Sequence, residues 1–473
     1  MTATRDAMIT TETLETTTPT RRGIPSVARR ALLAIQADWA GSRVWTFGAA
    51  TLALATLVCE AYYLNQPYVQ TDPDTVDYTR LAKAVAAGHL VDPIRTPVYP
   101  LFIHLISLVG GQGNLFAVAL AQAALYVLAC GGVYLMALRL VGRPPVAFLV
   151  AALLDTNTLL LSYVKPIMTE ALALFLVTAL ALVIAWHARS ARARTLWLAS
   201  GVLLLLAMTR PEWVYFGVPL LGFLLLVSWR QGKARPHLRH VALALVLFYA
   251  VCGLYSYENG VVNGTPGFSV NQNIDWLGKV MQYHMQNEAP PQYAAISREV
   301  SAYLAFGDYD SLHVISHDPN LLRNRMALAG VYGRAIVARH PIEYALKTVP
   351  VIFQSLRSTT PHQPVRPRGA FGAPLRALNV VSSLAQQSTA LFPFLALGWW
   401  AWLLARRRDG WDERTLLMCG LALIAGYGLA VTTLFVFIQY PRMNTPYDPL
   451  MLTVVWCSVA LVIPRAVRLV RRH

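Results

Sequence analysis

Long apolar runs separated by short basic clusters make up most of this chain. The runs are about 16–25 residues long, the length that an α-helix needs to cross the hydrocarbon core of a membrane. They predict an all-α polytopic membrane protein with about ten transmembrane helices. The expected crossings are 44–64, 114–138, 145–163, 170–187, 195–210, 213–229, 241–257, 389–404, 414–438 and 447–464.

Composition agrees with this class, because only 14% of the residues are charged and 56% are hydrophobic. Soluble domains carry about 25% charged residues. The net charge of +16 lies largely in short clusters between the apolar runs, as the positive-inside rule predicts, so it does not indicate a nucleic-acid partner. Placing these clusters in the cytoplasm puts both termini there. The Thr-rich segment 1–43 then forms a disordered cytoplasmic tail.

This path divides the remaining chain into three parts. Residues 44–257 form a seven-helix module whose first outer loop is 65–113, and 258–388 form a large extracytoplasmic loop with interfacial helices of its own. Residues 389–473 hold the last helices and a basic cytoplasmic tail. Within the first loop, 75–88 has apolar positions along one side, and 97–110 is too short for an ordinary span. We expect both to lie on the membrane surface, although whether 97–110 crosses stays open.

The candidate chemistry lies on the predicted outer side. Ionisable residues are rare near lipid unless they have a function, and here they gather at five separate outer boundaries. Asp72 is best explained as a helix cap. Asp74 is the better candidate for a general base. The prolines around Arg95 should hold its guanidinium ready to bind a phosphate or to orient a nearby carboxylate. The ionisable residues on this side are Asp72, Asp74, Asp77, Arg95, Lys165, Glu170, Arg210, Glu212, Arg442 and Asp448.

Several of these residues also have a structural interpretation. Glu170 at a helix start would be stabilised by the helix dipole. The charges of Arg210 and Glu212 would form a local ion pair across Pro211. Arg95 would anchor the chain to lipid headgroups.

The large loop carries many arginines between 321 and 376 against a single acid, Glu343. An anionic ligand such as a lipid phosphate or pyrophosphate would account for them, and the alternative is general attraction to lipid headgroups. His313 and His317, with Asp318, have a spacing that weakly suggests zinc. A divalent metal therefore stays open as a cofactor, and no metal ligand is assigned. The five cysteines show no metal-ligand or paired spacing.

Several short motifs resemble integral-membrane glycosyltransferases of the GT-C class. These are Pro73-Asp74-Thr75-x-x-Tyr78, Arg95-x-Pro97-x-Tyr99-Pro100, Thr169-Glu170, Arg210-Pro211-Glu212 and Tyr440-Pro441-Arg442. The nearest branch contains the protein O-mannosyltransferases and the aminoarabinose transferase of lipid A. The order of spans and outer loops is also similar to that class.

The resemblance implies an inverting enzyme that takes a sugar from a polyprenyl-phosphate carrier. Asp74 matches the catalytic base, and Arg95 matches the arginine of the proline-rich turn. Where relatives often have Asp-Glu or Asp-Ser, this chain has Asp74-Thr75, which puts a second, metal-binding acid in doubt. We therefore expect Asp74 and Arg95 to be catalytic. The expected substrate-binding residues are Asp77, Tyr78, Tyr99, Lys165, Glu170, Arg210, Glu212 and Arg442.

The expected partners are the lipid-linked donor, membrane lipids and a lipid, glycan or protein acceptor. The expected location is a bacterial-type plasma (inner) membrane with the active site outside the cytoplasm. The alternatives are a secondary transporter and a lipid-linked glycan polymerase or ligase. A transporter would place charges near mid-membrane in two repeated halves. The sequence shows no obvious internal repeat, and apart from Asp155 its charges concentrate at the predicted outer side.

Overall fold

The computed structural model describes residues 26–305, 314, 326–406, 411–437 and 439–470, without the side chains of 26–40 and 463–470. Every regular element in these ranges is helical. The chain divides into two units, residues 1–46 and 47–473, and the candidate functional residues all lie in the second. The all-α prediction is confirmed.

The elements of the first half cover the predicted seven-helix module. They are α1 (Ser26–Asn65), α2 (Pro73–Ala86), α3 (Val98–Gly110), α4 (Leu115–Val141), α5 (Pro144–Asp155), α6 (Thr158–Val164), α7 (Glu170–Ser190), α8 (Ala193–Ala207), η1 (Pro211–Phe216), α9 (Gly217–Arg230) and α10 (Ala234–Asn263).

The second half contains the large loop and the last helices. Its elements are α11 (Asn271–Gln282), η2 (Gln286–Glu288), η3 (Pro291–Tyr293), α12 (Ala294–Ala305), α15 (Ala327–Arg339), α16 (Pro341–Arg357), α17 (Gly372–Ser388), η4 (Thr389–Leu391), α18 (Phe392–Ala405), α19 (Glu413–Phe435), α20 (Tyr440–Asn444) and α21 (Asp448–Val470).

Within the described residues, seven helices are long and apolar enough to cross a membrane, or eight if the bent pair α5 and α6 is one span. The chain is therefore a polytopic membrane protein, while the count of ten stays a prediction. The helices α8 and the apolar part of α21 fall below the length of an ordinary span. The first helix begins at Ser26, within the segment that we expected to be a disordered tail.

The predicted crossing at 145–163 is not one straight helix. It bends by 54° between α5 and α6. The break occurs at Asn157, whose side chain accepts a hydrogen bond from the backbone N–H of Leu160 and so begins a new helix.

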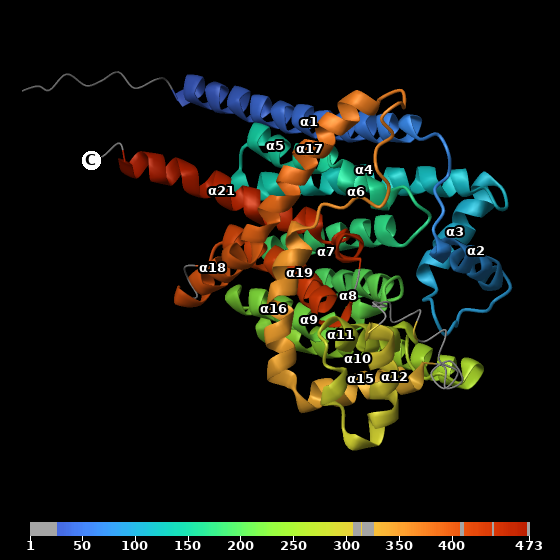
Figure 1. Ribbon diagram of the computed structural model, residues 1–473. Helices are drawn as coiled ribbons and strands as arrows, with labels where there is room; N and C mark the ends of the chain where they lie inside the picture. The colour runs from blue at the N-terminus through green and yellow to red at the C-terminus, as the bar shows by residue number, and fades with distance from the viewer. Residues whose placement is uncertain (1–25, 306–313, 315–325, 407–410, 438, 471–473) are drawn as a thin grey trace, which may run out of the picture. The chain divides into compact units, whose positions relative to one another are not determined.

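The centre of the second unit is α7, which is buried on nearly all sides. It packs against α4, α8 and α19 (Figure 1). Its sequence is apolar around the whole helix, which is typical of a central position in a bundle. Glu170 is its first residue and Arg189 lies in its last turn, so the two charges are at opposite ends.

The large loop has a hydrophobic core of its own. Side chains of α11, α12, α15 and α16 form this second cluster, which also includes Tyr440 of α20. Figure 1 shows α16 and α17 running across the direction of α4 and α7. The loop is therefore a folded part of the protein that reaches the segment carrying Arg442.

Candidate active site

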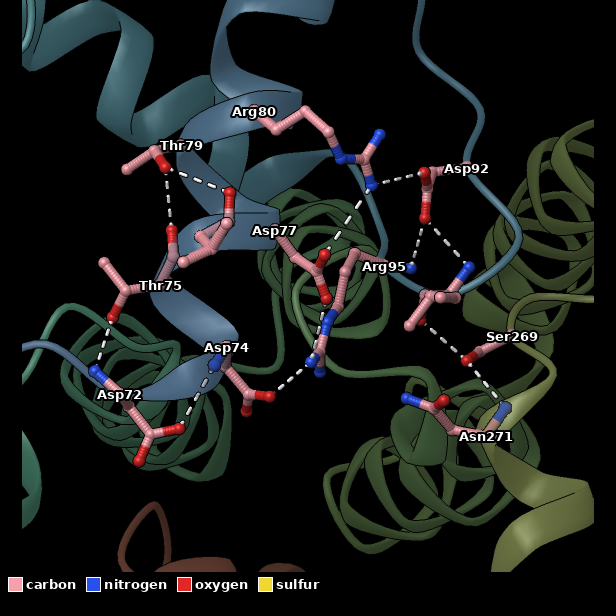
Figure 2. Close-up of polar contacts among 12 residues, drawn as sticks. Asp72, Asp74, Thr75, Asp77, Thr79, Arg80, Asp92, Arg95, Ser269 and Asn271 are labelled. Carbon is pink, nitrogen blue, oxygen red and sulfur yellow. Dashed lines mark hydrogen bonds and ion pairs between the residues drawn. The ribbon is translucent and has the colours of Figure 1, made fainter. Parts of the chain in front are cut away.

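The start of α2 places Asp74 on a fixed helical turn. The side chain of Asp72 accepts a hydrogen bond from the backbone N–H of Asp74, and the Thr75 hydroxyl accepts one from the N–H of Asp72 (Figure 2). These two reciprocal hydrogen bonds form a capping box, so Asp72 caps the start of α2 as predicted. Thr75 also donates to the carbonyl of Ile167, so α2 is attached to the turn that precedes α7.

Asp92 fixes the segment that presents Arg95. One of its carboxylate oxygens accepts hydrogen bonds from the backbone N–H groups of Ile94 and Arg95, and the other pairs with Arg80 at 3.2 Å. The Ser269 hydroxyl donates to the carbonyl of Ile94, as Figure 2 shows. The segment is thus held from both sides, and the Arg95 guanidinium points at α2.

Asp74 lies between two arginines that come from opposite ends of the sequence. Arg95 Nη2 contacts one oxygen of its carboxylate, and Arg442 Nη2 lies 2.5 Å from the other. Arg95 also lies 3.4 Å from Asp77. Since each oxygen has its own guanidinium, Asp74 is the link between the first outer loop and α20.

The ion pairs continue from Arg442 into the membrane-spanning bundle. Arg442 Nε lies 2.6 Å from Glu170, and the same oxygen of Glu170 lies 3.7 Å from Arg210. Arg210 Nε in turn lies 2.5 Å from Glu212. We call this chain of contacts the charge network; its members are Asp74, Asp77, Arg95, Glu170, Arg210, Glu212 and Arg442.

The network determines the charge of Asp74. Burial alone would raise the pKa of Asp74, but the guanidinium groups of Arg442 and Arg95 outweigh it and hold that pKa below its usual value. Burial would likewise lower the pKa of Arg442, but Glu170 and Asp74 raise it. Asp74 is therefore a carboxylate at neutral pH.

The two predicted tyrosines form an aromatic support under Arg95. The Arg95 guanidinium lies 5.0 Å from the centre of the Tyr78 ring, a cation–π contact. Tyr78 packs edge-on against Tyr99 at 4.8 Å. Tyr99 is buried and donates a 2.6 Å hydrogen bond to Gln122, so it reaches Arg95 only through Tyr78.

Lys165 lies outside the charge network. Its ammonium group donates to the carbonyl of Gln66 and lies over the rings of Tyr62, Tyr63 and Tyr68, at 5.0–5.8 Å. Burial, with the charge of Arg366, lowers the pKa of Lys165 to about 8. Among the described residues, aromatic rings, and not a carboxylate, are therefore the partners of the Lys165 ammonium group.

Some candidates can be placed only in part. Of the described residues, no three His, Cys, Asp or Glu side chains are arranged to hold a metal ion, while His313 and His317 lie outside the described ranges. Arg366 of the large loop stacks on Tyr68, and Arg334 bonds to Asn273. These two arginines contact side chains outside the charge network.

Two polar residues that the sequence analysis did not select hold the site together. Asp92 is one, and its position before Pro93 and a turn was a signal for a backbone-capping carboxylate. The other is Gln122, whose amide donates to the carbonyls of Val164 and Pro166. A glutamine in the middle of an apolar run was the available signal, because a buried amide needs partners.

A search of curated proteins finds no relative of the chain. Among solved structures, similar ones include the archaeal oligosaccharyltransferase AglB from Archaeoglobus fulgidus, solved in complex with an inhibitory peptide and a dolichol-phosphate, and the oligosaccharyltransferase of the same organism in its apo form. Both have 12% sequence identity, a TM-score of 0.46 and 88% coverage of this chain. The chain spans about half the length of either (50% and 51%).

The sequence also matches a protein-family model. The match covers residues 94–255, and the family is described as dolichyl-phosphate-mannose-protein mannosyltransferase. It includes Arg95, Glu170, Arg210 and Glu212 of the charge network, while Asp74, Asp77 and Arg442 lie outside it. This match confirms the resemblance to GT-C class membrane glycosyltransferases that the sequence motifs predicted.

Proposed function

We propose that the protein is an inverting glycosyltransferase that moves a sugar from a polyprenyl-phosphate carrier to an acceptor on the extracytoplasmic side of the membrane. The observation that carries this proposal is Asp74 held between Arg95 and Arg442. A carboxylate and two guanidinium groups at one position provide a proton acceptor next to cations that can bind a phosphate. The description of the matching family, with its lipid-phosphate-linked sugar, supports the same donor class.

In the proposed reaction, an acceptor hydroxyl attacks the anomeric carbon of the sugar from the face opposite the phosphate. The new bond forms between the hydroxyl oxygen and this carbon, while the bond from the carbon to the phosphate oxygen breaks. The hydroxyl proton passes to the Asp74 carboxylate, and the electron pair of the broken bond leaves with the lipid phosphate. One inversion at the anomeric carbon results.

The arginines have two proposed roles. In the absence of the donor they neutralise Asp74, which makes it a weak base. When the phosphate binds, Arg95 and Arg442 share their donors with it, and the loss of these hydrogen bonds makes Asp74 a stronger proton acceptor. The same guanidinium groups then stabilise the charge that develops on the leaving phosphate. Arg95 Nε, which is buried without a hydrogen-bond partner among the described residues, is available for this contact.

The direct test is transfer by the purified full chain in lipid nanodiscs, supplied with a panel of polyprenyl-phosphate sugars and with lipid-diphosphate oligosaccharides. We expect transfer from at least one monophosphate donor. We expect Asp74→Asn to reduce kcat by about 10²–10⁴-fold, the usual contribution of a general base. The asparagine keeps the size of the side chain, so the helices should stay intact by circular dichroism.

Glu413→Gln is a matched control. Glu413 also forms an ion pair with an arginine, Arg139, but it begins α19 and contacts no member of the charge network. This variant should keep wild-type transfer. Full turnover by Asp74→Asn would exclude Asp74 as the base, and transfer from diphosphate oligosaccharides alone would replace the proposed donor with that of an oligosaccharide ligase.

A further inference from the structure

Arg442 lies on a very short helix. Arg442 belongs to α20, which spans five residues, Tyr440–Asn444. So short a helix is not stable by itself, because a single turn does not compensate the entropy lost in forming it. Gln439, immediately before α20, has a left-handed backbone with φ of 60°. The direction of the Arg442 side chain therefore depends on what α20 packs against.

The large loop supplies that support through Lys279. Lys279 is fully buried on α11, and its ammonium group lies 3.1 Å from the Tyr440 hydroxyl and 3.2 Å from Gln282 Oε1. The Tyr440 hydroxyl donates to the same Gln282 oxygen at 2.9 Å. The ammonium group also lies 5.2 Å from the centre of the Tyr440 ring. Tyr440 is two residues before Arg442, so these contacts fix the start of α20.

Tyr283 links the same ammonium group to α16. The ammonium group lies 3.4 Å from the Tyr283 hydroxyl, which donates to Thr348 at 3.1 Å. Asn444, at the other end of α20, donates to Ser355 of α16. Both ends of α20 are therefore bonded to helices of the large loop, and Arg442 lies between them.

Stability alone does not explain a lysine at this position. Burying an ammonium group is unfavourable, and a methionine of similar length would fill the same space without that penalty. Burial lowers the pKa of Lys279 to about 7, although Asp275, one turn earlier on α11, acts in the opposite direction. What a lysine adds is directional donation to Tyr440.

We propose that Lys279 and Tyr440 are positioning residues, through which the large loop holds Arg442 against Asp74 and Glu170. The consequence for catalysis rests on the proposed function, whereas the positioning of α20 does not. Without Lys279, the Tyr440 hydroxyl loses the hydrogen bond that the Lys279 amine donates, and α20 is free to turn. Arg442 then contacts Asp74 and the leaving phosphate for a smaller fraction of the time.

The first test measures α20 directly. We expect hydrogen exchange of residues 439–445 to be about tenfold faster in Lys279→Met and in Tyr440→Phe than in the wild type, the effect of losing one hydrogen bond. Lys347→Met is the matched control, because Lys347 is a lysine of α16 in the same loop, pairs with Glu343 and donates to the carbonyl of Tyr283. It should leave exchange in 439–445 unchanged.

The second test measures transfer with the donor that the panel of lipid-linked sugars identifies. Each variant should lower kcat by about tenfold and change KM for the donor little, because Arg442 acts most strongly on the developing phosphate charge. The double variant should be no slower than either single variant, since both remove the same contact. Lys279→Gln, which keeps an N–H donor, should recover part of the loss.

The outcomes separate the two proposals. Unchanged exchange in both Lys279→Met and Tyr440→Phe, or the same increase in Lys347→Met, would overturn the positioning role whatever the reaction is. Absence of transfer in the wild type would count against the proposed function and leave the exchange test standing. If Lys279→Met does not fold, hydrogen exchange in Tyr440→Phe decides whether the positioning role holds, because this variant removes only a hydroxyl group.

Discussion

At the scale of single residues, the charge network brings four carboxylates close to three guanidinium groups. Asp74, Asp77, Glu170 and Glu212 face Arg95, Arg210 and Arg442 through a continuous series of ion pairs. Because the numbers of negative and positive charges are nearly equal, these groups can lie together in an environment that is partly shielded from water. A phosphate entering the network would add negative charge, so it must take guanidinium donors from a carboxylate already present.

The lowered pKa of Asp74 gives a prediction for stability. A carboxyl group whose pKa is lower in the folded state than in the unfolded chain stabilises the fold above its unfolded pKa, and this contribution disappears as the pH falls through the folded pKa. The ordinary value is 3.8. Thermal unfolding should therefore show wild type more stable than Asp74→Asn at pH 7, with the difference shrinking below about pH 4. A difference that stays constant from pH 7 to pH 3 would contradict the ion pairs of Asp74.

Much of the charge network could be predicted residue by residue. Charged side chains are rare in this chain, so those at outer boundaries were conspicuous, and all the network members were among the candidates. The position of Lys165 could not be predicted, because its partners are tyrosines whose rings meet only after α1 and the following loop have folded. Aromatic residues near a membrane are too common to indicate such a contact.

At the scale of elements, the capping residue Asp72 explains where α2 begins. The predicted surface helices at 75–88 and 97–110 correspond closely to α2 and α3. The bend between α5 and α6 could have been anticipated, since the sequence Asp155-Thr156-Asn157 contains residues that favour caps and turns over helix interiors. The apolar residues before and after this sequence instead favoured one continuous helix.

Close packing of α11 gives a prediction at this scale. A Cβ atom at Gly278 would lie only 2.2 Å from the Phe437 ring, which belongs to the segment leading to α20. Gly278→Ala should therefore push α11 and this segment apart and destabilise the protein by about 1–3 kcal/mol, the usual effect of overpacking. Differential scanning fluorimetry in detergent would measure the loss.

Gly253 provides the comparison for that variant. It lies in α10, where a Cβ atom would meet nothing within 4 Å. Gly253→Ala should leave the melting temperature unchanged or raise it, because alanine favours a helix more than glycine does. Equal melting temperatures for the two variants would show that the packing of Gly278 against Phe437 is loose enough to admit a methyl group.

At the scale of the whole molecule, we predict that the charge network and the basic end of α7 lie on opposite sides of the membrane. Val76, near the network, is 70% exposed, and Arg192, which follows α7, is also exposed. All five native cysteines are buried, so single new cysteines can be labelled selectively. In intact cells a membrane-impermeant maleimide should label Val76→Cys, and it should label Arg192→Cys only after permeabilisation. The reverse pattern would place the network in the cytoplasm.

The order of the helices along the chain was predictable, but their long-range contacts were not. Apolar length and basic clusters indicate where helices lie, since both are local properties of the sequence. They do not indicate that Asp74 meets Arg442, because this contact depends on how α20 packs against the large loop. The structure supplies that information.

The separation of Asp74 and Arg442 also affects how the protein is made. The two residues are 368 positions apart, so the ribosome completes every element from α1 to α19, including the entire large loop, before it reaches α20. Until then Asp74 and Glu170 have no contact with Arg442, and their charges must be tolerated in the nascent chain. A polypeptide that terminates before residue 440 would therefore carry an incomplete site, in which, among the described residues, Asp74 has only Arg95 and Glu170 has only Arg210 as a cationic partner.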